Sequence, residues 1–121
     1  MMLKIAFPIA AIVASATLAF PGVAMAANEP TRVTIHGPQG DFYGKVKSDK
    51  ASCIKERKVK VFKIKNSGPE KIASDISNNE GQWSVGTTGQ KNGRFYARAP
   101  AVDGCKAGTS ETIRLVDGEE Q

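Results

Sequence analysis

The sequence predicts an all-β domain, a seven-stranded antiparallel Greek-key sandwich that follows an N-terminal signal peptide. Three observations support this fold class. Short runs of alternating apolar and polar residues recur about every ten residues. Clusters of Gly, Pro, Asn and Asp separate these runs. No long segment shows the period of an amphipathic helix. Short strands at this spacing are typical of a β-sandwich.

The N-terminal segment has the composition of a secretory signal peptide. An apolar run from Ile5 to Phe20 follows Lys4, and Ala24-Met25-Ala26 forms an A-x-A cleavage pattern. The apolar run is shorter than the roughly 20 residues that span a bilayer. We therefore predict a signal peptide at residues 1–26 and a mature protein that is secreted, extracellular or periplasmic, and not membrane-spanning.

The mature chain is predicted to contain one domain. A loose polar leader covers residues 27–31, the sandwich covers residues 32–116, and a frayed acidic tail covers residues 117–121. The predicted strands are short segments of alternating apolar and polar residues, separated by turns and loops. They are Arg32–His36, Phe42–Lys47, Lys58–Lys65, Lys71–Asp75, Gln82–Val85, Arg94–Ala99 and Ser110–Val116.

The alternation also predicts which side chains face inward. In the strand at 58–65 the apolar positions change parity after Val61, which predicts a β-bulge or bend near Val61 and Phe62. The predicted core is made of apolar residues that share one face of each strand. They are Val33, Ile35, Phe42, Val46, Val59, Val61, Trp83, Val85, Phe95, Ala97, Ile113 and Leu115.

The two cysteines, Cys53 and Cys105, are predicted to form a disulfide, because exported chains with an even number of cysteines usually pair them. A metal pair or a redox pair is the alternative, although the chain has one histidine and no C-x-x-C motif. In a Greek-key sandwich the loops that carry Cys53 and Cys105 emerge at the same end. The bridge is therefore expected to tie that end.

The turn at Asn78–Gly81 precedes the only tryptophan and contains several oxygen-bearing side chains. An Asx-type turn with a positive φ at Gly81 is the favoured interpretation. A calcium site is the alternative, but the spacing of the calcium-loop motif is not met. We expect no metal and no cofactor. The residues considered for calcium are Asp75, Ser77, Asn78, Asn79 and Glu80.

Catalysis is not expected. His36 is the only imidazole, and its position at a strand end beside Gly37-Pro38 predicts an exposed side chain. The sequence shows no base–nucleophile pair and no G-x-S-x-G motif. The chain is therefore predicted not to be an enzyme.

Basic residues are concentrated between Lys45 and Lys71, which contain ten Lys or Arg and three acids in a chain of net charge +5. Such lysines can keep strands soluble and unaggregated. Alternatively they bind anionic polymers or the cell-envelope surface, with no sequence-specific nucleic acid contact. The candidate residues for polyanion binding lie on predicted strands: Lys45, Lys47, Lys58, Lys60, Lys63 and Lys65.

Over about residues 32–116 the chain resembles the transthyretin-like, carboxypeptidase-regulatory-like sandwich modules of secreted bacterial proteins. Six features in order carry the resemblance: Phe42–Val46, Cys53, Arg57–Phe62, Asp75 with Asn79–Trp83, Gly93–Ala97, and Cys105. The resemblance implies a prealbumin-like or immunoglobulin-like sandwich without catalytic activity. Such modules accompany enzymes or surface proteins as accessory, folding or binding units. We expect the sandwich to stand alone, without a partner domain, and it shows no ligand motif of the family, so a structural or interaction role with an unknown partner is expected.

Overall fold

The computed structural model describes residues 28–121, which form two antiparallel β-sheets and contain no α-helix. The predicted signal peptide and its cleavage position lie outside the described residues. Within residues 28–121, no helix is long and apolar enough to cross a bilayer.

The smaller sheet has three strands and the larger sheet has six. The smaller sheet is ordered β2 (Arg32–Val33), β3 (Asp41–Lys47) and β6 (Gln82–Thr87). The larger sheet is ordered β10 (Glu119–Glu120), β9 (Ile113–Val116), β7 (Gly93–Ala99), β4 (Lys58–Lys65) and β5 (Gly68–Ile76), and β8 (Gly108–Thr109) also pairs with β7. Two short 3-10 turns are η2 (Pro38–Gly40) and η3 (Ala51–Cys53).

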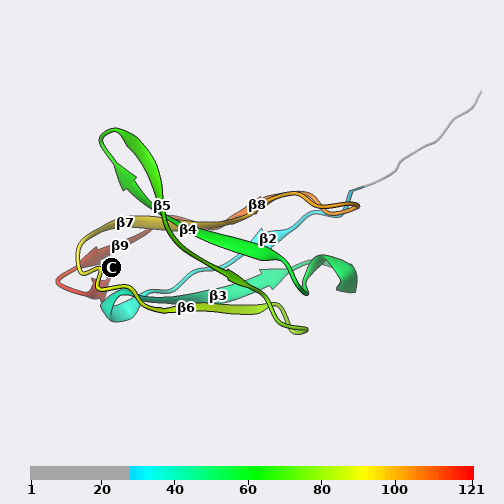
Figure 1. The fold of residues 1–121 in the computed structure, drawn as a ribbon, viewed down its shortest axis with the longest axis horizontal. Helices are drawn as coiled ribbons and strands as arrows, with labels where there is room; N and C mark the ends of the chain where they lie inside the picture. Colours follow the sequence, from blue (N-terminus) through cyan, green and yellow to red (C-terminus); the bar gives the residue numbers. More distant parts are fainter. Residues whose placement is uncertain (1–27) are drawn as a thin grey trace, which may run out of the picture.

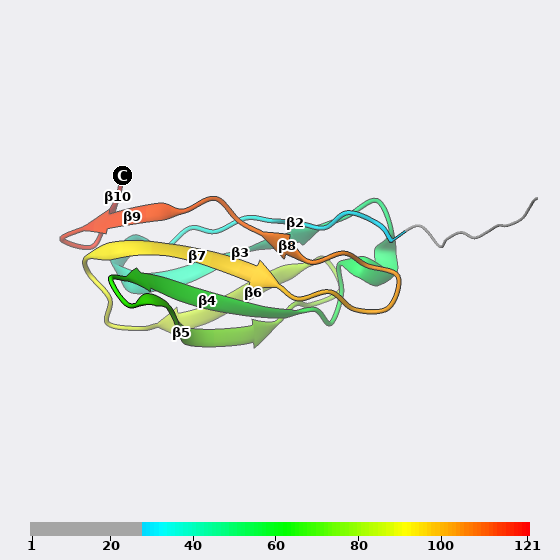
Figure 2. The ribbon, with the colours of Figure 1, turned by 90° about the horizontal axis from the view of Figure 1, so that it is seen from above.

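The two sheets form two layers (Figures 1 and 2). Buried apolar side chains from both sheets form one core. Figure 2 shows β9, β7, β4 and β5 side by side, in the order that the hydrogen bonding gives. The predicted core is confirmed except that Val85 and Ile113 are half-buried and pack against it. Ala99 is also buried in this core.

Each of the seven predicted strands has a counterpart, but β2 covers only Arg32–Val33 of the predicted 32–36, and β9 covers only Ile113–Val116 of the predicted 110–116. Two further short strands were not predicted. These are β8 and β10. The expectation of a frayed acidic tail is wrong, because Asp117 and Gly118 turn the chain with φ of 51° and 83° and β10 then pairs with β9. The Glu120 carboxylate accepts a hydrogen bond from the Gly37 amide at 3.0 Å and lies 3.2 Å from His36 Nδ1.

The predicted bulge is present, but the extra residue lies on β5 rather than β4. The β4–β5 register shifts between Val61 and Phe62, where Val61 pairs with Ala73 and Phe62 with Lys71, so Ile72 is the unpaired residue. The β4–β7 register continues without a shift through the same positions. Side chains along β4 therefore keep alternating, and Phe62 lies on the face opposite to Val61.

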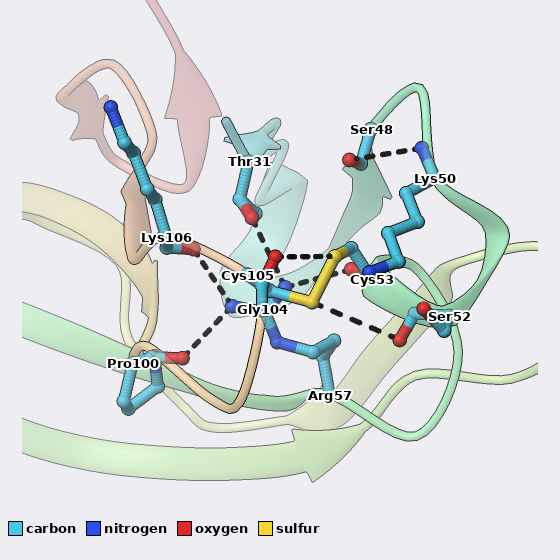
Figure 3. The surroundings of a disulfide bond; sticks show 10 residues. All are labelled: Thr31, Ser48, Lys50, Ser52, Cys53, Arg57, Pro100, Gly104, Cys105 and Lys106. Carbon is cyan, nitrogen blue, oxygen red and sulfur yellow. Dashed lines mark hydrogen bonds between the residues drawn. A yellow bond between two sulfur atoms is a disulfide. The ribbon is translucent and has the colours of Figure 1, made fainter. Parts of the chain in front are cut away.

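The predicted disulfide is confirmed. Cys53 and Cys105 are bonded, with their Cα atoms 5.5 Å apart. The bridge joins η3 to the loop after β7 at one end of the molecule (Figures 2 and 3). Both half-cystines are buried, so the bond is part of the packed end of the sandwich.

Beside the disulfide lies a buried arginine that the sequence did not predict (Figure 3). The Arg57 side chain is 1% exposed. Its guanidinium donates to the carbonyls of Cys53 at 2.7 Å, Pro100 at 2.8 Å and Lys106 at 3.1 Å, and to the Thr31 hydroxyl at 3.1 Å. Burial lowers the pKa of Arg57 from its usual value, because the charged form loses hydration.

The N-terminal leader is not loose, which corrects the expectation for its described residues. The Glu29 amide donates to the Gly104 carbonyl at 3.0 Å, and the Glu29 carbonyl accepts from the Lys106 amide at 2.8 Å. Because Thr31 also binds Arg57, the leader is held against the disulfide loop.

Replacing both cysteines by serine is expected to lower the free energy of unfolding by about 2–4 kcal/mol while preserving the fold. The loss arises because the unfolded chain regains the freedom that the bridge removes. Chemical denaturation measures it. Reducing agent should destabilise the natural protein by a similar amount and leave the double variant unchanged. A double variant as stable as the natural protein would contradict a stabilising role.

Candidate functional site

The six candidate lysines do not share one face of the molecule. Lys58 and Lys60 alternate with the buried Val59 along β4, so they lie on the outer face of the six-stranded sheet. Lys45 and Lys47 alternate with the buried Val46 along β3, so they lie on the outer face of the three-stranded sheet. The two pairs therefore belong to opposite sides of the sandwich.

Lys63 and Lys65 follow the inward parity of β4 and have partners of their own. Lys63 Nζ donates to Gln90 Oε1 at 3.0 Å and lies 5.8 Å from the centre of the Phe95 ring. Lys65 Nζ lies 2.8 Å from Glu70 Oε1. The hydrogen bond from Lys65, with its positive charge, lowers the pKa of the exposed Glu70 carboxyl. These two lysines are thus the least available of the six for an external anion.

The outer face of the six-stranded sheet gathers basic residues from four strands, and we call it the cationic face. Its members share a face because cross-strand pairing and the two-residue period of each strand place them on the same side as Lys60 and Phe62. They are Lys58, Lys60, Lys71, Arg94, Arg98 and Arg114.

Like charges stand directly opposite each other on this face. Lys60 is the cross-strand partner of Arg98, and Arg94 is the partner of Arg114. Directly opposed like charges destabilise a sheet, by an amount comparable to the roughly 0.2–1 kcal/mol of a favourable pair. The Arg98 guanidinium also donates to the Thr109 hydroxyl at 2.8 Å, which holds it over β8.

An aromatic pair separates the two rows of charge. Phe62 and Tyr96 are cross-strand partners, and their rings are stacked with centroids 5.2 Å apart and planes at 20°. Along β7 the outward order is therefore Arg94, Tyr96, Arg98.

The described residues contain two ion pairs, and neither involves the cationic face. They are His36–Glu120 and Lys65–Glu70. The six charges of the cationic face therefore have no carboxylate partner within residues 28–121. Strand pairing also places Glu119, opposite Val116, on this outer face, but its carboxylate is not within ion-pair distance of any of the six.

Sequence reasoning found part of this face and missed the rest. Lys58 and Lys60 were candidates, and the outward alternation of Arg94, Tyr96 and Arg98 was visible along the strand. The strand order, which places β7 between β4 and β9, is what joins them.

The structure shows where the residues considered for catalysis and for metal binding lie. His36 is exposed, as predicted, and contacts Glu120. The turn before β6 is of the Asx type, because Asn78 Oδ1 accepts from the Glu80 amide at 3.0 Å and the Gln82 amide at 2.9 Å. Gly81 has a φ of 83°. Residues 28–121 contain no group of three or more His, Cys, Asp or Glu side chains arranged to hold a metal ion.

Comparison with known proteins does not place the chain in a family. No family model, no curated protein and no solved structure matches it.

Proposed function

We propose that this protein is an exported, non-catalytic β-sandwich module that binds anionic polymers of the cell envelope through its cationic face. We also propose that its seven main strands form a Greek-key sandwich of the transthyretin-like, carboxypeptidase-regulatory-like kind. The two antiparallel sheets and the order of the resembling segments support this assignment. The binding role rests on the face itself.

The observation that carries the proposal is the opposition of Lys60 to Arg98 and of Arg94 to Arg114 without a carboxylate partner. Lysines that only prevent aggregation do not need to be paired with other cations across strands. A bound polyanion turns this repulsion into attraction, and it releases counterions when it binds. The arrangement is therefore better explained by binding than by solubility.

The spacing of the charges favours a polymer over a small anion. Residues two apart on a strand are separated by roughly 7 Å, so Arg94 and Arg98 lie about 13 Å apart along β7. A single carboxylate or sulfate group cannot reach both rows. A chain of such groups can, and arginine side chains bind carboxylate, sulfate and phosphate oxygens in pairs.

Two features other than the cationic face support export of the protein. The Cys53–Cys105 disulfide is of the kind that persists in oxidising compartments, and the sequence predicts a signal peptide. In those compartments an anionic polymer of the cell envelope is an available partner for a cationic surface.

Heparin affinity measures the proposed binding, because heparin is an accessible linear polyanion. The natural protein should be retained, with affinity that falls log-linearly as salt rises. Replacing Lys60, Arg94, Arg98 and Arg114 together by glutamine should weaken binding by at least about tenfold at physiological salt and flatten the salt slope.

The matched control removes the same charge elsewhere. Glutamine at Lys50, Lys55, Lys91 and Lys106, which are exposed and lie outside the cationic face, should reduce retention much less. Equal loss in both variants would mean that net charge alone causes retention. Elution of the natural protein at low salt would reject the binding role and leave a structural one.

A further inference from the structure

The outer face of the three-stranded sheet, on the side away from the cationic face, carries a second surface feature. It is an open cavity of about 490 Å³ centred on β3, and we call it the β3 basin. This volume lies within the range of about 300–1,000 Å³ typical of small-molecule sites. The side chains that matter for its chemistry are Thr34, His36, Tyr43, Lys45, Lys47 and Gln82.

Strand alternation and one glycine shape the basin. Tyr43, Lys45 and Lys47 share one face of β3, while Val46 points into the core. Gly44 allows the chain after β2 to approach closely, because a Cβ atom at this position would collide with the Thr34 carbonyl oxygen. Thr34 is thereby held against β3, where its amide donates to the Lys45 carbonyl at 2.9 Å.

Two acceptor atoms along the rim already have partners. Thr34 Oγ1 accepts from the Lys45 amide at 2.9 Å, and Gln82 Oε1 accepts from Asn78 Nδ2 at 2.9 Å. The Thr34 hydroxyl hydrogen and the Gln82 NH2 group therefore remain to donate. The Asx turn at Asn78 holds Gln82 in this orientation.

Positive charge adds to this excess of donors. Lys45 and Lys47 have no carboxylate within ion-pair distance among the described residues, and Lys47 stands directly opposite Arg32 on β2. The Glu120 carboxylate, which contacts the rim residue His36, is already bound to His36 and to the Gly37 amide. The basin thus fits a ligand that is anionic and rich in hydrogen-bond acceptors.

The aromatic rings at one end of the basin favour a ligand that also has an apolar surface. Tyr43 is 45% exposed, and its ring centroid lies 5.6 Å from that of His36. Exposed aromatic rings provide a flat apolar surface with a polar tip. Inorganic phosphate would use the lysines and leave this surface without a partner, whereas a pyranose ring has both hydroxyl acceptors and apolar C–H faces.

We propose that the β3 basin binds an acidic sugar, a hexuronic acid unit. Its carboxylate is held by Lys45 and Lys47, its hydroxyls accept from Gln82 and Thr34, and its ring lies against Tyr43. This site is separate from the cationic face and does not depend on polymer binding there.

Titration of the isotopically labelled protein with galacturonic acid trisaccharide, followed by NMR, tests the site. Saturable shifts are expected at the amides of Tyr43, Lys45, Lys47 and Gln82. A neutral galactose trisaccharide should bind at least about tenfold more weakly. Tyr43→Ala and Lys45→Gln should each reduce affinity for the acidic sugar by about tenfold, and Tyr43→Phe should retain most of it.

The matched controls are Lys60→Gln and Arg98→Gln, which change the opposite sheet and should leave the titration unaltered. Equal binding of the neutral trisaccharide, or absence of saturation below about 20 mM, would overturn the proposal. Shifts confined to the cationic face would overturn it while supporting polymer binding there. Tight binding of inorganic phosphate, with a sugar affinity insensitive to Tyr43→Ala, would reject the sugar as the ligand.

Discussion

Trp83→Ala is expected to lower the free energy of unfolding by about 3–5 kcal/mol. Trp83 is 3% exposed on β6 and belongs to the apolar core. Its cross-strand partner is Gly44, which has no side chain that could fill the space left by the indole. The cavity therefore stays open, and the cost includes both lost burial and lost packing. Urea unfolding, followed by circular dichroism because the tryptophan is absent, measures the change.

Trp83→Phe provides the control for this prediction. The indole Nε1 is buried without a hydrogen-bond partner within residues 28–121. Phenylalanine removes this unpaired donor and keeps most of the apolar volume, so its cost should stay below about 2 kcal/mol. A loss under about 1 kcal/mol for Trp83→Ala would contradict the buried position of the ring.

Arg57→Met is expected to destabilise the protein by about 3–5 kcal/mol, although methionine has a similar length and removes a buried charge. The reason is that the acceptors around Arg57 come from separate segments and have no substitute donor. The Cys53, Pro100 and Lys106 carbonyls would lose the bonds that the guanidinium makes. Each buried acceptor left unpaired costs about 1–3 kcal/mol before relaxation.

Arg57→Lys is the informative comparison, because it keeps the charge and loses the planar fork of donors. Its stability should lie between those of the natural protein and Arg57→Met. Because Arg57 binds the carbonyl of Cys53, the loss of unfolding free energy on replacing Arg57 should not simply add to the loss on removing the disulfide. A double-mutant cycle measures this coupling. Suppose that Arg57→Met costs under about 1 kcal/mol and that its cost adds fully to the cost of removing the disulfide. The guanidinium would then not hold this end of the molecule together.

The local pattern of the chain was sufficient for the strands and most of the core. Period-two alternation depends on neighbouring residues alone, so it identified β3, β4, β6 and β7 and their inward faces. The turn at Asn78 and Gly81 was readable for the same reason, because an Asx side chain bonds to its own backbone. The cysteine pair was predictable because the chain offers a single intramolecular pairing.

Four further features depended on contacts between segments that are distant in sequence. The strands β8 and β10 have two residues each, too short for any period, and exist through pairing with β7 and β9. Arg57 is charged and lies in a loop, and its burial follows from carbonyls supplied by η3 and by the loop between β7 and β8. Lys63 lies on the inward face because the extra residue of the bulge lies on β5, so the alternation of side chains along β4 is not interrupted.

The register between strands decided which charged residues lie together on the two candidate surfaces. The sequence alone determined that lysines and arginines alternate with core residues, which places them on outer faces of strands. It did not determine which cations face one another, because register is set by hydrogen bonds and core packing between whole strands. Tertiary structure opposed Lys60 to Arg98 and Arg94 to Arg114, separated both pairs from Lys45 and Lys47, and so created two distinct cationic surfaces.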